Sequence, residues 1–117
     1  MIAISSCADH ELTICFTGDV LLDRGVREQI DRRGIDALFA DVAPLWANYD
    51  AVVVNLECPV TTRQAPVNKQ YIFRGEPEWL PALRKAGITH AVLANNHTYD
   101  QGRGGLEDTY HNLKAAK

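Results

Sequence analysis

The stretch ITHAVLANNHTYD, from Ile88 to Asp100, decides how this chain is expected to fold. Its first half is apolar and rich in residues that favour strands, and its second half becomes polar at Asn95, Asn96 and His97. Strands of this kind are usually buried in parallel sheets, which bind ligands beyond the carboxyl ends of their strands. The stretch therefore predicts a buried strand that ends in chemically reactive side chains.

Two earlier stretches repeat this arrangement. LTICFTGDVLLDR passes from an apolar run into Asp19, and AVVVNLECP passes from an apolar run into Asn55 and Glu57. The intervals between these polar ends are long enough for one crossover helix each, so parallel strands can bring them to a single sheet edge. The three expected strands span residues 12–18, 50–55 and 88–94.

Helix signals lie between the first two expected strands. The first predicted helix spans 25–33 and ends at Gly34, a residue type that often follows the last turn of a helix. Asp41 is placed to cap a second helix, because Pro44 then falls in the first turn, where a missing N–H is tolerated. The chain therefore starts as a strand followed by helices and a second strand.

The second half of the chain adds a polar loop at 59–69 and a short expected strand at 70–73. A helix is then predicted to start between Pro77 and Pro81 and to end before Gly87. A last helix starts near the glycines at 102–105, and the apolar residues expected to share one of its faces are Leu106, Tyr110 and Leu113.

This alternation predicts an α/β fold with a mainly parallel sheet flanked by helices. The 117 residues suffice for one domain, which we take to span 1–117. At most four strands are expected, so the pattern corresponds to half of a larger, truncated fold. An uncovered apolar sheet surface favours pairing between molecules, and we therefore expect a homo-oligomer. Alternatively, helices cover both sheet faces and the 59–69 loop folds over the edge, which would weaken self-association.

The overall charge argues against some classes of function. A formal net charge of -3 and a pI near 5.7 provide no basic field, so nucleic-acid binding is not expected. Cys7, Cys15 and Cys58 lack the spacing of a zinc motif, and we expect them to act as small buried residues. The sequence shows no signal peptide and no membrane span, so the chain as given reads as soluble, which leaves its localisation open.

Asp19 and Glu57 are the first candidate site residues. Two ionised carboxylates at one sheet edge repel each other unless a cation or a shared proton lies between them. Asn96 would add a neutral amide oxygen, and this set of ligands suits a divalent ion such as Mg, Mn, Fe or Zn. The alternative is structural: Asp19 caps the next helix, Glu57 pairs with an arginine, and Asn95 and Asn96 stabilise a turn. Spacing alone does not separate these interpretations.

His97 and Arg24 are the candidate catalytic residues. His97 can protonate a leaving oxygen or bind a metal, and Arg24 can hold a phosphate or carboxylate with two parallel hydrogen bonds. The plain alternatives are that His97 only forms a hydrogen bond and that Arg24 pairs with Glu28, one helical turn later. Asp100 is placed either to bond His97 or to fix the turn.

Three basic residues make the middle loop locally positive. A loop of this charge suits an anionic polymer, or a phosphorylated or carboxylated substrate, although an ordinary solvated loop has the same composition. The three residues are Arg63, Lys69 and Arg74.

Several stretches, in the same order and spacing, resemble the bacterial poly-γ-glutamate capsule-synthesis family of the CapA or PgsA type. They are GDVLLDR at 18–24, VVVNLECPVT at 52–61, YIFRG at 71–75 and AGITHAVLANNHTYDQGRGGLEDTYHNLKAA at 86–116. The resemblance covers nearly the whole chain after residue 12. Several motifs in register make it specific, whereas ANNH alone would be weak.

That family is similar to the calcineurin-like metallophosphatases, in which two halves stack as a four-layer α/β/β/α sandwich around a dinuclear metal site. The resemblance implies that Asp19 is a metal ligand, that Glu57 stands at the position of the bridging carboxylate, that Asn96 is the asparagine ligand and that His97 is the acid beside it. Members of the family are often membrane-associated. They continue into a further half-domain with late histidine ligands, so we expect weak or absent metal binding and negligible phosphatase turnover from this chain.

Three hypotheses of function follow from the resemblance. In the first, the chain serves capsule biosynthesis as a metal-dependent hydrolase or phosphoesterase, in which Asp19, Glu57 and Asn96 hold the metal, His97 is the general acid and Arg24 steadies the anion. In the second, it is a non-catalytic subunit that binds the carboxylates of an anionic polymer in a synthesis or export complex. In the third, the fragment is inert and pairs with another copy through its sheet.

Overall fold

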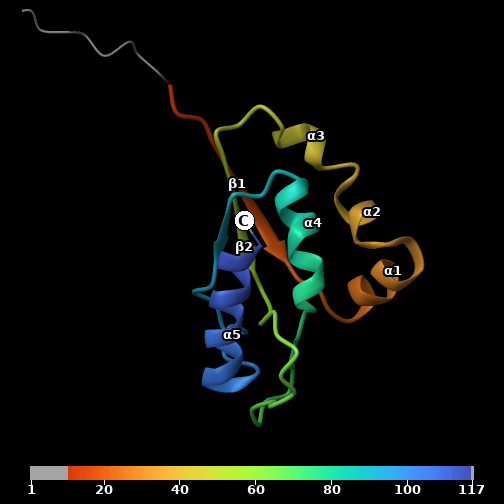
Figure 1. The fold of residues 1–117 in the computed structure, drawn as a ribbon, viewed down its shortest axis with the longest axis vertical. Helices are drawn as coiled ribbons and strands as arrows, with labels where there is room; N and C mark the ends of the chain where they lie inside the picture. Colours follow the sequence, from red (N-terminus) through yellow and green to blue (C-terminus); the bar gives the residue numbers. More distant parts are fainter. Residues whose placement is uncertain (1–10, 117) are drawn as a thin grey trace, which may run out of the picture.

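In the computed structural model, which describes residues 11–116, parallel strands form one sheet in the order β1, β2, β3 (Figure 1). The strands span Ile14–Val20 (β1), Ala51–Leu56 (β2) and His90–Val92 (β3). Each begins within two residues of its expected start, and the prediction of an α/β fold with a parallel sheet is confirmed. The expectations about Cys7 and about a leader at the start of the chain fall on positions outside the described range.

Helices fill both intervals between strands, as predicted. The helix expected at 25–33 is confirmed, and the helix expected before Gly87 also forms and ends there, where glycine adopts a positive φ of 99°. The helical elements are α1 (Gly25–Arg33), α2 (Ile35–Phe39), α3 (Ala43–Trp46), a 3-10 turn η1 (Pro77–Trp79), α4 (Leu80–Lys85) and α5 (Gly102–Ala115).

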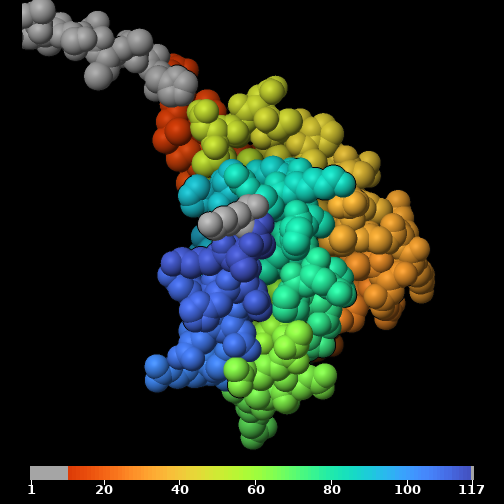
Figure 2. Space-filling model, viewed as in Figure 1, coloured from red at the N-terminus to blue at the C-terminus, as the bar shows by residue number. Residues whose placement is uncertain are grey.

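One face of the sheet is covered by these helices. Along β2, buried residues alternate with half-buried ones, and the buried Val52, Val54 and Leu56 belong to the core. Helices α1 and α4 contribute to the same core through Ile30 and Leu83. Figure 1 shows α4 and α5 drawn over the sheet, and in Figure 2 the packed atoms of α4 and α5 largely hide the sheet from this side.

The opposite face of the sheet is open in the described residues. Phe16 is 77% exposed on β1, and Ile14 and Val92 are exposed as well. The strand register pairs Phe16 with Val53 and Val53 with His90, so these side chains form a row across the same face. Helices do not cover both faces in the described residues, so that alternative is wrong, and self-association stays a prediction.

The short strand predicted at 70–73 is wrong. Residues 70–73 form no strand, and the nearest bridge pairs Gly75 with Val60. The physical reason is that carboxylates take up its backbone donors: the N–H of Phe73 donates to Asp100, and the N–H of Arg74 donates to Asp23, each at 2.8 Å. Because these N–H groups already donate to side chains, they are not available to pair with a neighbouring strand.

One prediction about the helices is also wrong. Asp41 does not cap α3; the cap position is Val42, and no side chain caps it, because Ala40 and Val42 both keep helical backbone angles and leave no extended residue for a cap. The last predicted helix forms as α5, on which Gly105 and Thr109 are buried, Leu106 and Leu113 are half-buried and Tyr110 is 49% exposed.

The close approach of α5 to the segment after β2 determines which residues of the helix are buried. The hydroxyl of Thr109 accepts a hydrogen bond from the N–H of Val60 at 2.9 Å and donates to the carbonyl of Gly105 at 2.7 Å. Small residues permit this close approach, and the apolar periodicity of the sequence does not reveal it. The helix consequently fixes the segment that follows β2, which leads into the candidate site.

Candidate functional site

The candidate site lies at the carboxyl ends of β1 and β2. The register places Asp19 opposite Asn55, after an irregularity in β1 between Phe16 and Asp19. The side-chain nitrogen of Asn55 donates to Asp19 Oδ1 at 2.8 Å and also to Glu57 Oε2. The structure therefore brings the two predicted carboxylates together, around a single amide nitrogen.

Asn95 connects this pair to the loop after β3. Its side-chain nitrogen donates to Asn55 Oδ1 at 3.0 Å and to the carbonyl of Leu56 at 2.9 Å, and its oxygen accepts from the N–H of His97 at 3.0 Å. Sequence reasoning selected Asn96, whose side chain is exposed and forms no hydrogen bond with the described residues. Sequence reasoning noted Asn55 and Asn95 as polar residues at strand ends but did not choose them as site residues, and the pairing of Asp19 with Asn55 is visible only in the strand register.

His97 is buried and its ring is fixed on two sides. Its Nδ1 lies 2.7 Å from Asp100 Oδ2, and its ring centroid lies 4.2 Å from that of Phe73. Asp100 is fully buried and also accepts from the ammonium of Lys69 at 2.6 Å and from the N–H of Phe73. Asp100 thus both bonds His97 and holds the turn, and the Nε2 atom of His97 is left for other partners.

Arg24 lies over the rings of Phe73 and Tyr71. Its guanidinium carbon is 5.2 Å from the ring centroid of Phe73 and 5.5 Å from that of Tyr71. It forms no ion pair with Glu28 or with any other carboxylate in the described residues, so the pairing alternative is wrong. Arg24 and His97 are far apart in the sequence, and both contact the phenyl ring of Phe73.

The three basic residues of the middle loop are each paired with a carboxylate. Their partners show that this loop presents little free positive charge, so the interpretation of the loop as an open anion-binding surface loses its basis. Arg24 is the basic residue near the site that keeps an unpaired guanidinium among the described residues. The pairs are Arg63 with Asp108 at 3.0 Å, Lys69 with Asp100 at 2.6 Å and Arg74 with Glu76 at 2.6 Å.

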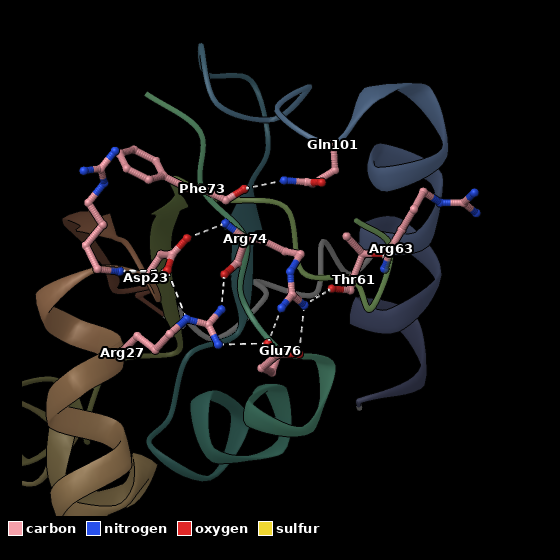
Figure 3. Close-up of polar contacts among 9 residues, drawn as sticks. Asp23, Arg27, Thr61, Arg63, Phe73, Arg74, Glu76 and Gln101 are labelled. Atoms are coloured by element: carbon pink, nitrogen blue, oxygen red, sulfur yellow. Dashed lines mark hydrogen bonds and ion pairs between the residues drawn. The ribbon is translucent and has the colours of Figure 1, made fainter. Parts of the chain in front are cut away.

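A cluster of alternating charges links α1 to the segment that follows the middle loop (Figure 3). Its members are Asp23, Arg27, Arg74 and Glu76. Arg27 donates to Asp23 at 3.0 Å and to Glu76 at 2.8 Å, and its guanidinium carbon lies 4.9 Å from the ring centroid of Trp79. The hydrogen bond from Arg74 lowers the pKa of Glu76, against the opposing effect of burial, and Arg27 adds to the lowering. We call this set the closed cluster, because every charge in it has an opposite partner.

The donor set at the sheet edge fits part of a metal site. Asp19 and Glu57 converge on one point, and a divalent cation would balance their charges there as the Asn55 amide cannot. No group of three histidine, cysteine, aspartate or glutamate side chains suited to a metal occurs within residues 11–116. Burial raises the pKa of the neighbouring Cys58 to about 11, so its thiol is protonated at neutral pH and is a poor ligand.

Comparison with known proteins decides the family. Residues 13–117 match the model of the bacterial capsule synthesis protein PGA_cap family. The chain belongs to the PGA_cap family. A capsule biosynthesis protein CapA from Bacillus anthracis is 34% identical over 112 residues, and a PGA biosynthesis protein CapA from Bacillus subtilis (strain 168) is 30% identical over 108 residues.

This PGA_cap chain spans about a quarter of the length of those two relatives. The alignments cover 92% and 91% of the chain but 27% and 28% of the relatives. The match includes every element that builds the candidate site, from β1 to α5. In the described part of this PGA_cap chain, no helix is long and apolar enough to cross a membrane.

Proposed function

We propose that this chain acts in the biosynthesis of an anionic capsule polymer of the poly-γ-glutamate type, on a metallophosphatase-like scaffold. Family membership and the names of the two CapA relatives support the biological process. The observation that supports a metal-dependent site is the convergence of Asp19 and Glu57 on the amide nitrogen of Asn55. Two carboxylates held this way form a place for a cation.

The residues proposed to hold a divalent metal (Mn, Fe, Zn or Mg) are Asp19, Glu57 and Asn96. When bound, such an ion would polarise a phosphoryl or acyl oxygen of the substrate. Asn96 is exposed and its side chain is free of hydrogen bonds with the described residues, so its amide is available as a neutral ligand. The role of Asn95 is then to hold the strand ends in register rather than to bind the ion.

The remaining chemistry is assigned to His97 and Arg24. Because Asp100 occupies Nδ1 of His97, the ring is held so that Nε2 can donate a proton to a leaving oxygen. The guanidinium of Arg24, unpaired with any described carboxylate, binds the anionic group of the substrate. Phe73, which contacts both side chains, fixes the spacing between acid and anion site.

A second function, a non-catalytic subunit that binds polymer carboxylates, is favoured by one observation. The described residues offer two carboxylates and amides but no third charged or histidine ligand, which falls short of a two-metal centre. In that case Arg24 and a weakly held cation would bind the polymer, and His97 would be dispensable. The two functions therefore differ in what substitution of His97 does.

The proposal is tested by complementation in a capsule-producing Bacillus strain that lacks its own CapA. The complete reading frame that contains this chain is expressed, and surface polymer is measured. We expect Asp19→Asn to abolish polymer production, whereas Asp36→Asn, a matched change in an exposed pair with Lys85, leaves it intact. Loss with His97→Gln supports catalysis, and retention supports the binding subunit. Normal polymer with Asp19→Asn would refute the proposed site.

A further inference from the structure

Arg24 has a backbone conformation that ordinary residues avoid. Its φ is 55° and its ψ is -130°, and it is the one residue other than glycine with positive φ in the described range. This region of backbone space is populated almost entirely by glycine, because a Cβ atom there meets the backbone. A glycine does follow at Gly25, but the strained position itself is occupied by arginine. Strain of this kind persists only where surrounding contacts enforce it.

The carboxylate of Asp23 enforces the conformation. Asp23 Oδ1 accepts from the N–H of Arg24 at 2.8 Å and from Nε of Arg27 at 3.0 Å. Asp23 Oδ2 accepts from the N–H of Arg74 at 2.8 Å. Figure 3 shows the bonds of this carboxylate with Arg27 and Arg74. Three donors thus hold the Asp23 carboxylate, and the carboxylate in turn holds the peptide group between Asp23 and Arg24.

The strained backbone directs the side chain of Arg24 over two aromatic rings. Tyr71 is 54% exposed, and the guanidinium lies 5.5 Å from the centroid of its ring and 5.2 Å from that of Phe73. No described carboxylate neutralises it. An exposed, aromatic-supported guanidinium without an acidic partner is suited to an oxyanion from outside the chain.

We propose that Asp23 is a positioning residue that holds Arg24 in a strained conformation so that its guanidinium forms an oxyanion subsite with Tyr71. The inference rests on the proposed function, in which Arg24 binds the anionic group of the substrate, and it adds the residue that aims it. The shared chemistry of the ligand is a carboxylate of a glutamate polymer or a phosphate group. The competing explanation is that Arg24 only stabilises the fold by packing on the rings.

Unfolding measurements test the strain without any ligand. Arg24→Ala keeps the strained backbone and Arg24→Gly relieves it, so we expect the glycine variant to have the higher Tm of the two, by about 4 °C or more. The matched control is Arg32 in the last turn of α1, where glycine must give a lower Tm than alanine. A lower Tm for Arg24→Gly than for Arg24→Ala would overturn the strain argument.

Binding measurements by calorimetry test the subsite, with inorganic phosphate in one arm and a γ-linked glutamate oligomer in the other. We expect Arg24→Ala and Arg24→Gly to lose binding at least tenfold, and the arm that binds identifies the oxyanion. For Asp23→Asn, the direction of the change in affinity separates a positioning role from a purely electrostatic effect. Removing a negative charge should tighten anion binding if only electrostatics matters, whereas a positioning role predicts severalfold weaker binding.

Two outcomes would overturn the subsite. One is equal affinity in wild type and Arg24→Ala, and the other is no binding of either probe to the wild type. Tighter binding by Asp23→Asn would overturn the positioning role alone. Because these measurements need neither metal nor turnover, failure of the proposed function (normal polymer with Asp19→Asn) and failure of the anion subsite (unchanged binding in Arg24→Ala) are distinguishable.

Discussion

Two polar clusters of this structure differ in charge balance. The closed cluster sets Asp23 and Glu76 against Arg27 and Arg74, with every charge paired. The site cluster sets Asp19 and Glu57 around neutral amides, with no cation between them in the described residues. Paired charges hold a loop in place, whereas like charges brought together oppose folding and indicate a place for a ligand.

The largest expected effect on stability is in the closed cluster. Arg27→Met leaves Asp23 and Glu76 without their shared partner in a half-buried place, and we expect the free energy of unfolding to fall by about 2 kcal/mol. Urea denaturation measures it. The control is Arg103→Met, which removes an exposed pair with Glu107 and should leave the free energy of unfolding nearly unchanged. Equal effects of both changes would break the contrast between a supporting cluster and an ordinary surface pair.

The closed cluster should also produce a specific acid dependence. Arg74 and Arg27 hold the pKa of Glu76 below its ordinary value of 4.5, so the carboxylate stabilises the fold above that pH and loses its contribution as the pH falls through the lowered pKa. Wild type should therefore lose more stability than Glu76→Gln in acid below about pH 4.5. Denaturation curves from pH 6 to pH 3 measure this, and parallel losses in the two proteins would contradict it.

In the site cluster the sign of the stability effect should reverse. Asp19→Asn removes one of two converging carboxylates and keeps an oxygen for the Asn55 amide, so we expect a gain of about 0.5 kcal/mol in the free energy of unfolding without added metal. Thermal and urea unfolding of the metal-free protein measure the change. A loss as large as that of Arg27→Met would mean that both clusters are structural.

The smallest expected effect on unfolding belongs to the open sheet face. Phe16→Ser replaces a side chain that is 77% exposed, so the fold should tolerate it, but the change removes apolar surface from the face proposed to pair with a second copy. We predict a homo-oligomer for the wild type and a shift toward monomer for the variant, measured by light scattering. A wild-type monomer at high micromolar concentration would contradict this proposal.

Sequence patterns were sufficient for the sheet and for part of the site. The apolar runs predicted β1 to β3 and their parallel arrangement. The expected burial holds only for the central strand β2, because β1 and β3 are the edges of the sheet and expose Phe16 and Val92. The position of Asp19 and Glu57 at strand ends was likewise readable. The convergence of the two side chains on Asn55 was not, since it depends on a register irregularity in β1 that no local pattern reports.

Errors arose where side chains replaced regular backbone pairing. The strand expected at 70–73 failed because Asp23 and Asp100, from distant parts of the chain, accept from its N–H groups. The loop lysine Lys69 looked like a substrate-binding residue and instead neutralises buried Asp100. These three contacts join residues 27, 31 and 51 positions apart, so the periodicity and composition of the sequence contain no sign of them.

The most direct test of the central claim is a titration of the metal-free protein with Mn²⁺, followed by calorimetry. The account predicts weak, saturable binding of one ion per chain that disappears in Asp19→Asn and in Glu57→Gln and persists in the matched control Asp36→Asn. Binding that is unchanged in both site variants, or the absence of any binding that depends on Asp19, would contradict the account.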